Sequence, residues 1–239
     1  MLHERLCPAE SNAKFSMDRR VIKHDKRIDD ILKSRSMSRK PIDKDGDCCF
    51  RAVARNISRI TSTGEIDRQV VEHLSKLNLF KQSEDRLVTK LRELTVSEWS
   101  GENRKDYDYF LKSNVNFEKE IEQFSKPGHF DGELGDHMVR AMANVLKTSI
   151  EIFSSMKDYP VIPIAPRQQL HGMPQLLLSF NEAGMHYDYV CRENDLSEPE
   201  EKTSEEKKEK QGKVFCSRRV NRKGQGPVAN VSNNVISSY

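Results

Sequence analysis

The 239-residue chain lacks several features that would place it in a special class of protein. No stretch approaches the roughly 20 apolar residues needed to cross a membrane, and the first residues lack the apolar core of a signal peptide. The five cysteines are odd in number and irregularly spaced, which argues against a secreted disulfide framework. The net charge is only +3, so no overall field predicts a nucleic-acid partner. We therefore expect a monomer inside the cell, cytoplasmic with the nucleus as an alternative, that does not enter a membrane.

A recognisable pattern of metal ligands is also missing from the sequence. His129, His137 and His171 do not combine with a cysteine pair at the spacing of a zinc site. Cys48 and Cys49 are adjacent and do not form a Cys-x-x-Cys motif. We therefore predict no metal and no cofactor. A vicinal disulfide between the two cysteines is an alternative, but it would block any reaction that needs a free thiol.

The most informative segment is residues 43–53, where an acidic turn is followed by a helical pattern. The turn Asp45-Gly46-Asp47 offers a helix start, and apolar residues then recur at helical spacing: Phe50, Val53, Ala54 and Ile57. Cys48 falls at the start of this helix, nearly opposite the apolar stripe, whereas Cys49 lies about a quarter-turn from it. We therefore predict that the Cys48 side chain points away from the core and is the candidate nucleophile.

A helix start suits a thiol nucleophile for electrostatic reasons. The thiolate is the reactive form, and an ordinary cysteine with a pKa of about 8.5 is mostly protonated at neutral pH. Unpaired N–H groups and the positive end of the helix dipole stabilise an anion, and a nearby imidazole can pair with it. The same N–H groups can hold an oxyanion, and Gly46 lets the loop backbone approach a substrate closely. This local chemistry favours acyl transfer.

A second polar segment, His186 to Val190, follows a short apolar run and a turn. Its alternation is typical of a strand, in which His186 and Asp188 share one face. The carboxylate of Asp188 would then orient the imidazole and stabilise its cationic form. Asp45 is the competing acid, since it could order the loop, support the oxyanion donors or touch the histidine. The spacing leaves both acids open.

These segments resemble the ovarian-tumour (OTU) family of cysteine proteases, whose members commonly remove ubiquitin or ubiquitin-like proteins from conjugates. The resemblance lies in Asp45-Gly-Asp-Cys-Cys-Phe-Arg-Ala52 together with His186-Tyr-Asp188, over a region of roughly residues 38–192. Glu133 to Asn144, followed by Thr148 to Phe153, also resembles the middle helix and following strand of the family. Leu134 and Val139 stand where many members have an aromatic residue and a carboxylate, which affects expected contacts with the ubiquitin tail.

The resemblance implies a papain-type fold and a cofactor-free reaction on ubiquitin or ubiquitin-like conjugates. It implies Cys48 as nucleophile, His186 as general base, and Asp188 or Asp45 as the supporting acid. A catalytically inactive OTU-like module that binds ubiquitin is the main alternative. A nucleic-acid-binding protein that acts through its basic ends ranks last, because no aromatic residues interleave the basic runs.

The remaining pattern predicts an α/β fold with a small central sheet packed between helices. Three helices are expected around Ile66–Leu77, Leu87–Leu94 and Met138–Leu146. Short strands are expected at residues 150–153, 161–164, 176–180 and 187–190, with Pro163 placing its strand at an edge or shortening it.

Three regions follow from these patterns. Residues 1–37 form a basic N-terminal extension with one short helix, marked by the stripe Ile28, Ile31 and Leu32. Residues 38–192 form the OTU-like catalytic domain. Residues 193–239 are a charged tail that is too poor in apolar residues to form a core, and we expect it to be disordered. Within the catalytic region, Trp99, Tyr107 and Phe110 are read as core anchors, with a partly exposed docking surface as the alternative.

Overall fold

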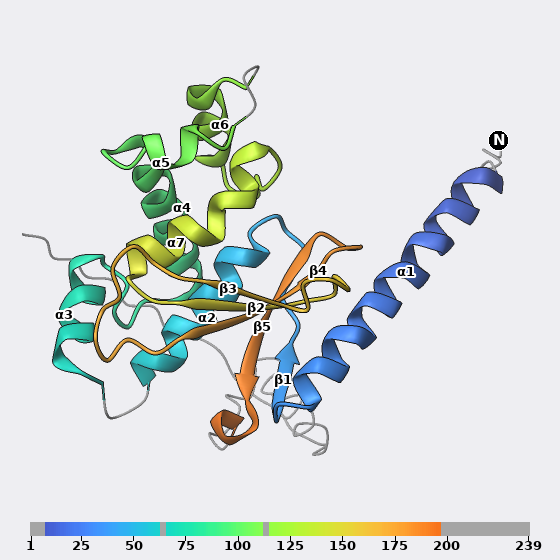
Figure 1. Cartoon of the computed structure of the whole chain (residues 1–239), viewed down its shortest axis with the longest axis horizontal. Helices are drawn as coiled ribbons and strands as arrows, with labels where there is room; N and C mark the ends of the chain where they lie inside the picture. Colours follow the sequence, from blue (N-terminus) through green and yellow to red (C-terminus); the bar gives the residue numbers. More distant parts are fainter. Residues whose placement is uncertain (1–7, 63–65, 112–114, 197–239) are drawn as a thin grey trace, which may run out of the picture. The chain divides into compact units, whose positions relative to one another are not determined.

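The computed structural model describes residues 8–62, 66–111 and 115–196. Within these residues, five strands form one sheet in the order β1 (Met37–Lys40), β5 (His186–Arg192), β4 (Leu176–Asn181), β2 (Ile150–Ser154) and β3 (Val161–Ile164). Strands β2 and β4 are parallel, and the other neighbours are antiparallel. Figure 1 shows the sheet with helices around it, which confirms the predicted mixed α/β arrangement.

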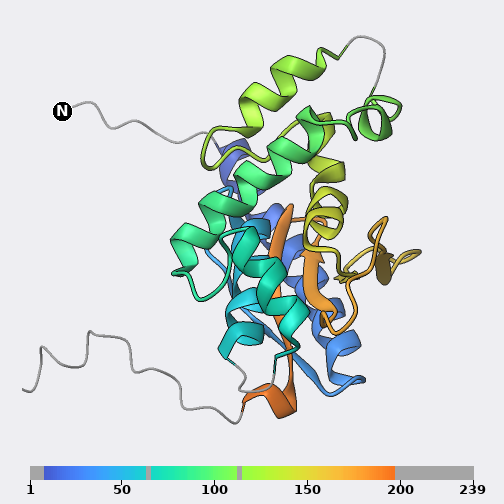
Figure 2. The same ribbon diagram turned by 90° about the vertical axis from the view of Figure 1, so that its left-hand side faces the viewer.

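One face of the sheet carries the main core. Helix α2 (Cys48–Ser62) packs on strands β4 and β5, and α4 (Glu84–Ser100) packs on α2 and α7 (Met138–Leu146). Figure 2 shows α2, α3 (Arg68–Lys76) and α4 on the same side of the sheet. Inward residues of the strands, such as Ile152, Leu178 and Tyr189, join this core. The three helices predicted from apolar spacing are therefore confirmed as α3, α4 and α7.

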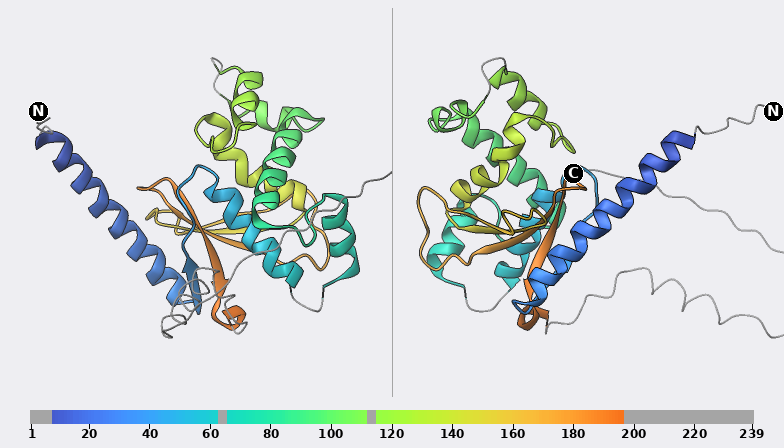
Figure 3. Two further views of the ribbon diagram at one scale, coloured as in Figure 1. Left: turned by 180° about the vertical axis from the view of Figure 1, so that it is seen from behind. Right: turned by 45° about the vertical axis from the view of Figure 1, so that its right-hand side comes forward.

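The C-terminal part of helix α1 (Pro8–Lys33) packs on the other face of the sheet, and Figure 3 shows the N-terminal part of this helix projecting away from the sheet. Ile28 and Leu32 are buried against residues of alternate strand positions: Phe153, Leu177 and Val190. Because successive strand residues point to opposite faces, the sheet buries apolar side chains on both sides. The sequence predicted only a short helix here. The structure has 26 helical residues, and the contact of Ile28 and Leu32 with the sheet stabilises the C-terminal end of this helix.

The segment between α4 and α7 contains two short helices, α5 (Lys105–Asp108) and α6 (Phe117–Phe124), and the 3-10 turn η1 (Glu133–His137). Trp99 and Tyr107 are buried, and their rings meet edge to face with centroids 6.4 Å apart. They anchor helices to the core, as predicted. Phe110 differs from the prediction, because its side chain is 47% exposed and rests beside the His137 ring.

The four predicted strands are all present, each within two residues of its expected bounds. Pro163 lies in β3, which is an edge strand as its proline requires. Strand β1 was not predicted, and a second 3-10 turn, η2 (Glu193–Leu196), follows β5. The predicted C-terminal tail lies outside the described residues from position 197 onward. Among the helices of the described part, none is long and apolar enough to span a bilayer.

Candidate active site

The loop before Cys48 has a conformation that requires glycine. Gly46 has φ of +80°, and a Cβ atom there would clash with the carbonyl oxygen of Gly128. Asp45 Oδ1 accepts a hydrogen bond of 2.9 Å from the N–H of Asp47, which closes the turn just before the helix. The backbone leading to the thiol is therefore fixed on one side by its own turn and on the other by a neighbouring loop.

Asp47 extends this support into the core. Its carboxylate forms an ion pair with the buried Arg92, and Arg92 also donates hydrogen bonds of 2.8 Å to the carbonyl oxygens of Phe124 and His129. The Arg92 guanidinium lies 4.6 Å from the centroid of the Phe50 ring. Arg92 thus connects the loop before Cys48 to the loop after α6. Sequence reasoning missed this residue, because nothing local distinguishes it from the other arginines of the chain.

Cys48 is the first residue of α2, at the end where anions are stabilised. It is more buried than the helical spacing predicted, with only 7% of its surface exposed. The prediction considered the stripe of α2 alone, whereas other elements cover the opposite side of the helix start. The exposed part of Cys48 borders a cavity of about 440 Å³. The first-turn N–H groups of α2 lack intrahelical acceptors, as at any helix start, so they are free to donate to an anion beside Cys48.

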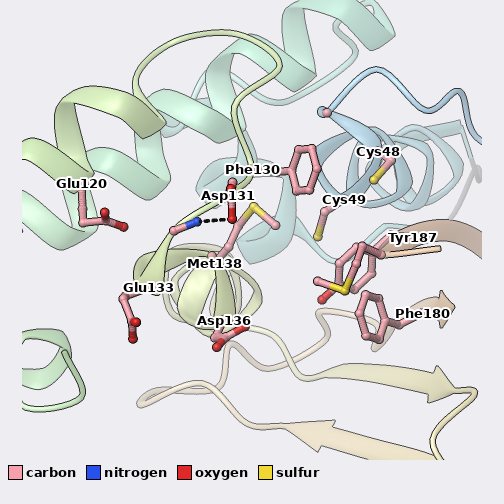
Figure 4. A pocket seen from close by; sticks show the side chains of 14 residues that line it. Cys48, Cys49, Glu120, Phe130, Asp131, Glu133, Asp136, Met138, Phe180 and Tyr187 are labelled. Carbon is pink, nitrogen blue, oxygen red and sulfur yellow. Dashed lines mark hydrogen bonds between the residues drawn. The ribbon is translucent and has the colours of Figure 1, made fainter. Parts of the chain in front are cut away.

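Cys49 lines the same cavity and differs from Cys48 in its surroundings (Figure 4). It is 2% exposed. Burial, reinforced by the neighbouring Cys48, raises the pKa of the Cys49 thiol well above its ordinary value, against the opposing charge of Arg92. Cys49 is therefore a protonated, weak nucleophile at neutral pH. The described cysteines Cys48, Cys49 and Cys191 are all free thiols.

His186 and Asp188 occupy the start of β5 and share one face of the strand, as the alternation predicted. His186 Nε2 lies 3.1 Å from Asp188 Oδ1. Burial lowers the pKa of His186, but interactions with Asp188 and Cys48 outweigh burial and raise this pKa to about 9. Because Nε2 faces the carboxylate, the other ring nitrogen, Nδ1, is the one available to the thiol. The fold thus brings Cys48, His186 and Asp188 together.

Asp188 is held by more than the histidine. The backbone N–H of Ile42 donates to Oδ1 at 2.9 Å, and Arg39 Nη1 donates to Oδ2 at 3.1 Å. Burial raises the pKa of Asp188, but the hydrogen bonds from His186 and Ile42 and the charges of His186 and Arg39 lower it overall. Asp188 therefore stays ionised beside the imidazole, where it favours the cation.

The structure does not bring Asp45 to the histidine. Its carboxylate pairs with Arg51 at 2.6 Å and accepts the turn hydrogen bond from Asp47. Slight burial raises the pKa of Asp45, but the Arg51 side chain and the Asp47 N–H lower it overall. Of the roles that the sequence left open for Asp45, these contacts fit the ordering of the loop.

The cavity beside the thiols has acidic and apolar walls. Its acidic lining residues are Glu120, Asp131, Glu133 and Asp136, and its apolar or aromatic ones are Phe130, Met138, Phe180, Met185 and Tyr187. Figure 4 shows the two thiols facing this lining, with Asp131 accepting a 2.9 Å hydrogen bond from the N–H of Gly132. Three glycines, 46, 132 and 135, also border the cavity. The carboxylates of this lining attract positive charge.

Across residues 8–62, 66–111 and 115–196, no group of three or more histidine, cysteine, aspartate or glutamate side chains is arranged to hold a metal ion. The groups that the structure brings together at the site are a thiol, an imidazole, a carboxylate and backbone N–H groups. Together they can carry out nucleophilic acyl transfer.

Comparison with known proteins found one matching family model and several similar solved structures. The family model described as OTU-like cysteine protease matches residues 43–187, which include Cys48 and His186. Similar solved structures include the OTUD1 OTU domain, with 20% identity, coverage of 72% of this chain and 97% of that chain, and a TM-score of 0.49. The Hazara virus OTU bound to ubiquitin has 12% identity, coverage of 66% and 82%, and a TM-score of 0.38. No curated protein matches the sequence.

Proposed function

The chain belongs to the OTU-like cysteine protease family, and on this premise we propose that it is a cysteine-type deubiquitinase. The proposed reaction is hydrolysis of the isopeptide or peptide bond after the C-terminal glycine of ubiquitin or a ubiquitin-like protein. The observation that carries the proposal is the position of His186, which interacts with Asp188 on one side and Cys48 on the other, at the start of helix α2.

In the proposed first half-reaction, His186 holds the thiol proton as the imidazolium of an ion pair, and the Cys48 thiolate attacks the glycine carbonyl carbon. First-turn N–H groups of α2 hold the developing oxyanion. The imidazolium then gives its proton to the departing amine nitrogen as the C–N bond breaks, which leaves a thioester on Cys48. Asp188 keeps the ring oriented and stabilises its cationic form throughout.

In the second half-reaction, water attacks the thioester carbonyl and gives a proton to His186. The C–S bond breaks, the substrate leaves with a free carboxyl group, and the proton stays on His186, which restores the ion pair with the Cys48 thiolate. No external oxidant, reductant or metal is needed for this balance. The acidic walls of the cavity support a substrate whose flexible tail is basic, because the carboxylates attract positive charge in a partly desolvated space.

Turnover of a ubiquitin C-terminal fluorogenic reporter tests the proposal. We expect Cys48→Ala to abolish turnover while circular dichroism and melting temperature stay close to wild type. Cys191→Ala is the matched control, because Cys191 is a buried free thiol on β5 and should keep turnover. Binding of ubiquitin without turnover by the wild-type protein would favour the inactive ubiquitin-binding module, and turnover by Cys48→Ala would remove this thiol from the mechanism.

A further inference from the structure

Helix α1 and strand β1 precede residues 43–187, the segment that the family model matches, yet Arg39 of β1 contacts the acid of the site, and side chains of α1 contact Arg39. Arg39 lies directly opposite Val190 in the antiparallel pair of β1 and β5. Strand alternation places Val190 on the same face as Asp188, and α1 covers this face. Arg39, Asp188 and the helix therefore meet on one side of the sheet.

Arg39 forms ion pairs with three carboxylates. Its Nη1 donates to Asp188 Oδ2 at 3.1 Å and also to Asp25 Oδ1 of α1. Its Nε and Nη2 donate to the two oxygens of Asp29, one turn further along α1, at 3.2 and 3.3 Å. The two-point contact with Asp29 fixes the plane of the guanidinium, because the spacing of its N–H groups matches a carboxylate. Helix α1 thus fixes the orientation of the Arg39 guanidinium relative to the Asp188 carboxylate.

This orientation keeps the two oxygens of Asp188 separate. Oδ1 receives the Ile42 N–H and faces His186, while only Oδ2 receives Arg39. Without its partners on α1, the guanidinium would be free to form a two-point pair with Asp188 and to compete with His186 for Oδ1. The side chains of Arg39 and Asp188 are 16% and 8% exposed, so water screens this competition poorly.

Asp25 also supports the strand that carries the histidine. It accepts a 2.8 Å hydrogen bond from Asn181 Nδ2, and Asn181 lies opposite His186 in the pairing of β4 with β5. Asn181 Oδ1 accepts from the N–H of Gly184 in the turn between these strands. A single carboxylate of α1 therefore contacts both the arginine beside Asp188 and the asparagine paired with His186.

We propose that Arg39, held by Asp25 and Asp29 of helix α1, is a positioning residue that orients Asp188 and through it His186. The N-terminal helix is then a part of the catalytic unit and does more than cover the sheet. This inference rests on the proposed function, since it assigns a role within the same site.

The test measures steady-state reporter turnover for the full chain carrying Arg39→Gln, Arg39→Lys, and the double change Asp25→Asn with Asp29→Asn. We expect kcat to fall about tenfold for Arg39→Gln, with KM within about twofold, because only the geometry of the reacting groups changes. Arg39→Lys should recover part of the loss. The alkaline limb of the rate profile should move to higher pH in the Gln variant, because a positive charge near the imidazolium is lost, and to lower pH in the double aspartate variant, where the freed guanidinium competes with His186 for Oδ1.

Two further comparisons separate positioning from mere stability. Asp30→Asn changes the same charge on an exposed position of the same helix and should leave kcat and the pH profile unchanged. The triple variant, with Arg39→Gln and both aspartate changes, should lose little more kcat than Arg39→Gln alone, because the aspartates act through the arginine. The proposal would be overturned if the Arg39 and Asp30 variants had the same kcat and the same pH profile. It would also be overturned if the lower rate of the Arg39 variants matched their unfolded fraction while the alkaline limb stayed at the wild-type pH.

Alkylation of Cys48 by iodoacetamide, mapped by mass spectrometry, gives a readout that needs no ubiquitin. If the wild-type protein fails to cleave the reporter, the proposed function fails, but the pH dependence of alkylation still reports the positioning of His186. We expect the Arg39→Gln and double aspartate variants to change this pH dependence and Asp30→Asn to leave it unchanged. Identical alkylation profiles for all of them would reject the role of Arg39 independently of substrate.

Discussion

The role of Asp188 can be tested by Asp188→Asn, which keeps the size of the side chain and removes its charge. A rise in the pKa of His186 from 6.5 to about 9 corresponds to roughly 3 kcal/mol in favour of the imidazolium. Asp188 and Cys48 are the attractive partners, and burial opposes them. If Asp188 supplies about half of the attraction, its loss costs roughly 1.5–2 kcal/mol, so kcat/KM should fall about 10- to 30-fold.

The same substitution should also shift the pH dependence of the rate in a defined direction. Removing the carboxylate weakens the stabilisation of the imidazolium, so its pKa falls and its proton leaves at lower pH. Wild-type activity should persist until the pH approaches about 9 and then decline. The alkaline limb of Asp188→Asn should lie at lower pH. Steady-state kinetics on a ubiquitin reporter between pH 5.5 and about 10 would measure both profiles.

Stability should follow the same linkage. The pKa of His186 in the folded state is raised above 6.5, so its protonation stabilises the folded protein. This contribution to the free energy of unfolding is fully present below pH 6.5 and is lost as the pH rises through about 9. The difference in melting temperature between wild type and Asp188→Asn should therefore narrow at alkaline pH. Part of it should remain, because Arg39 and the Ile42 N–H also bind Asp188.

Asp45→Asn is the control for this experiment. Asp45 pairs with Arg51 at the surface, so its loss should change kcat/KM by only a few fold and leave the alkaline limb unmoved. The reasoning is refuted if Asp188→Asn keeps the wild-type profile, or if Asp45→Asn is the variant that moves it.

The remaining predictions concern the loop, the cavity and helix α1. Gly46→Ala should lower kcat more than about tenfold, because its Cβ would clash with the Gly128 carbonyl oxygen. Gly184→Ala is its control, since the added Cβ makes only ordinary contacts, and its kcat and melting temperature should stay close to wild type. Asp136→Asn should raise KM for a basic-tailed substrate about threefold to tenfold with little change in kcat, and an unchanged KM at low salt would argue against the acidic wall. Ile28→Ala should destabilise the fold by about 2–5 kcal/mol in urea unfolding, and a loss below about 1 kcal/mol would show that α1 packs on the sheet only loosely.

The elements that depend on local pattern were predictable from the sequence. Apolar spacing identified α3, α4 and α7, and alternation placed His186 and Asp188 on one face of β5. The choice between Asp45 and Asp188 was not local. It depends on which carboxylate the fold brings to the imidazole, and only the strand geometry gives Asp188 the 3.1 Å contact.

Other features depend on contacts between segments far apart in sequence. A helical wheel of α2 considers one helix, so it could not foresee that other elements bury Cys48 to 7% exposure. Strand β1 is four residues of ordinary polar sequence that becomes a strand only because β5 pairs with it. Arg39 meets Asp188 through this pairing and meets α1 through the packing of the helix, and neither contact leaves a local signal.

Covalent capture tests the central claim most directly. Ubiquitin carrying a thiol-reactive group in place of its C-terminal glycine carboxyl would be incubated with the full chain, and the adduct would be mapped by mass spectrometry. The account predicts one thioether, on Cys48, formed by the wild-type protein and by Cys191→Ala. An adduct on Cys49, or tight binding without any covalent product, would contradict the assignment of Cys48 as the nucleophile of a ubiquitin-cleaving enzyme.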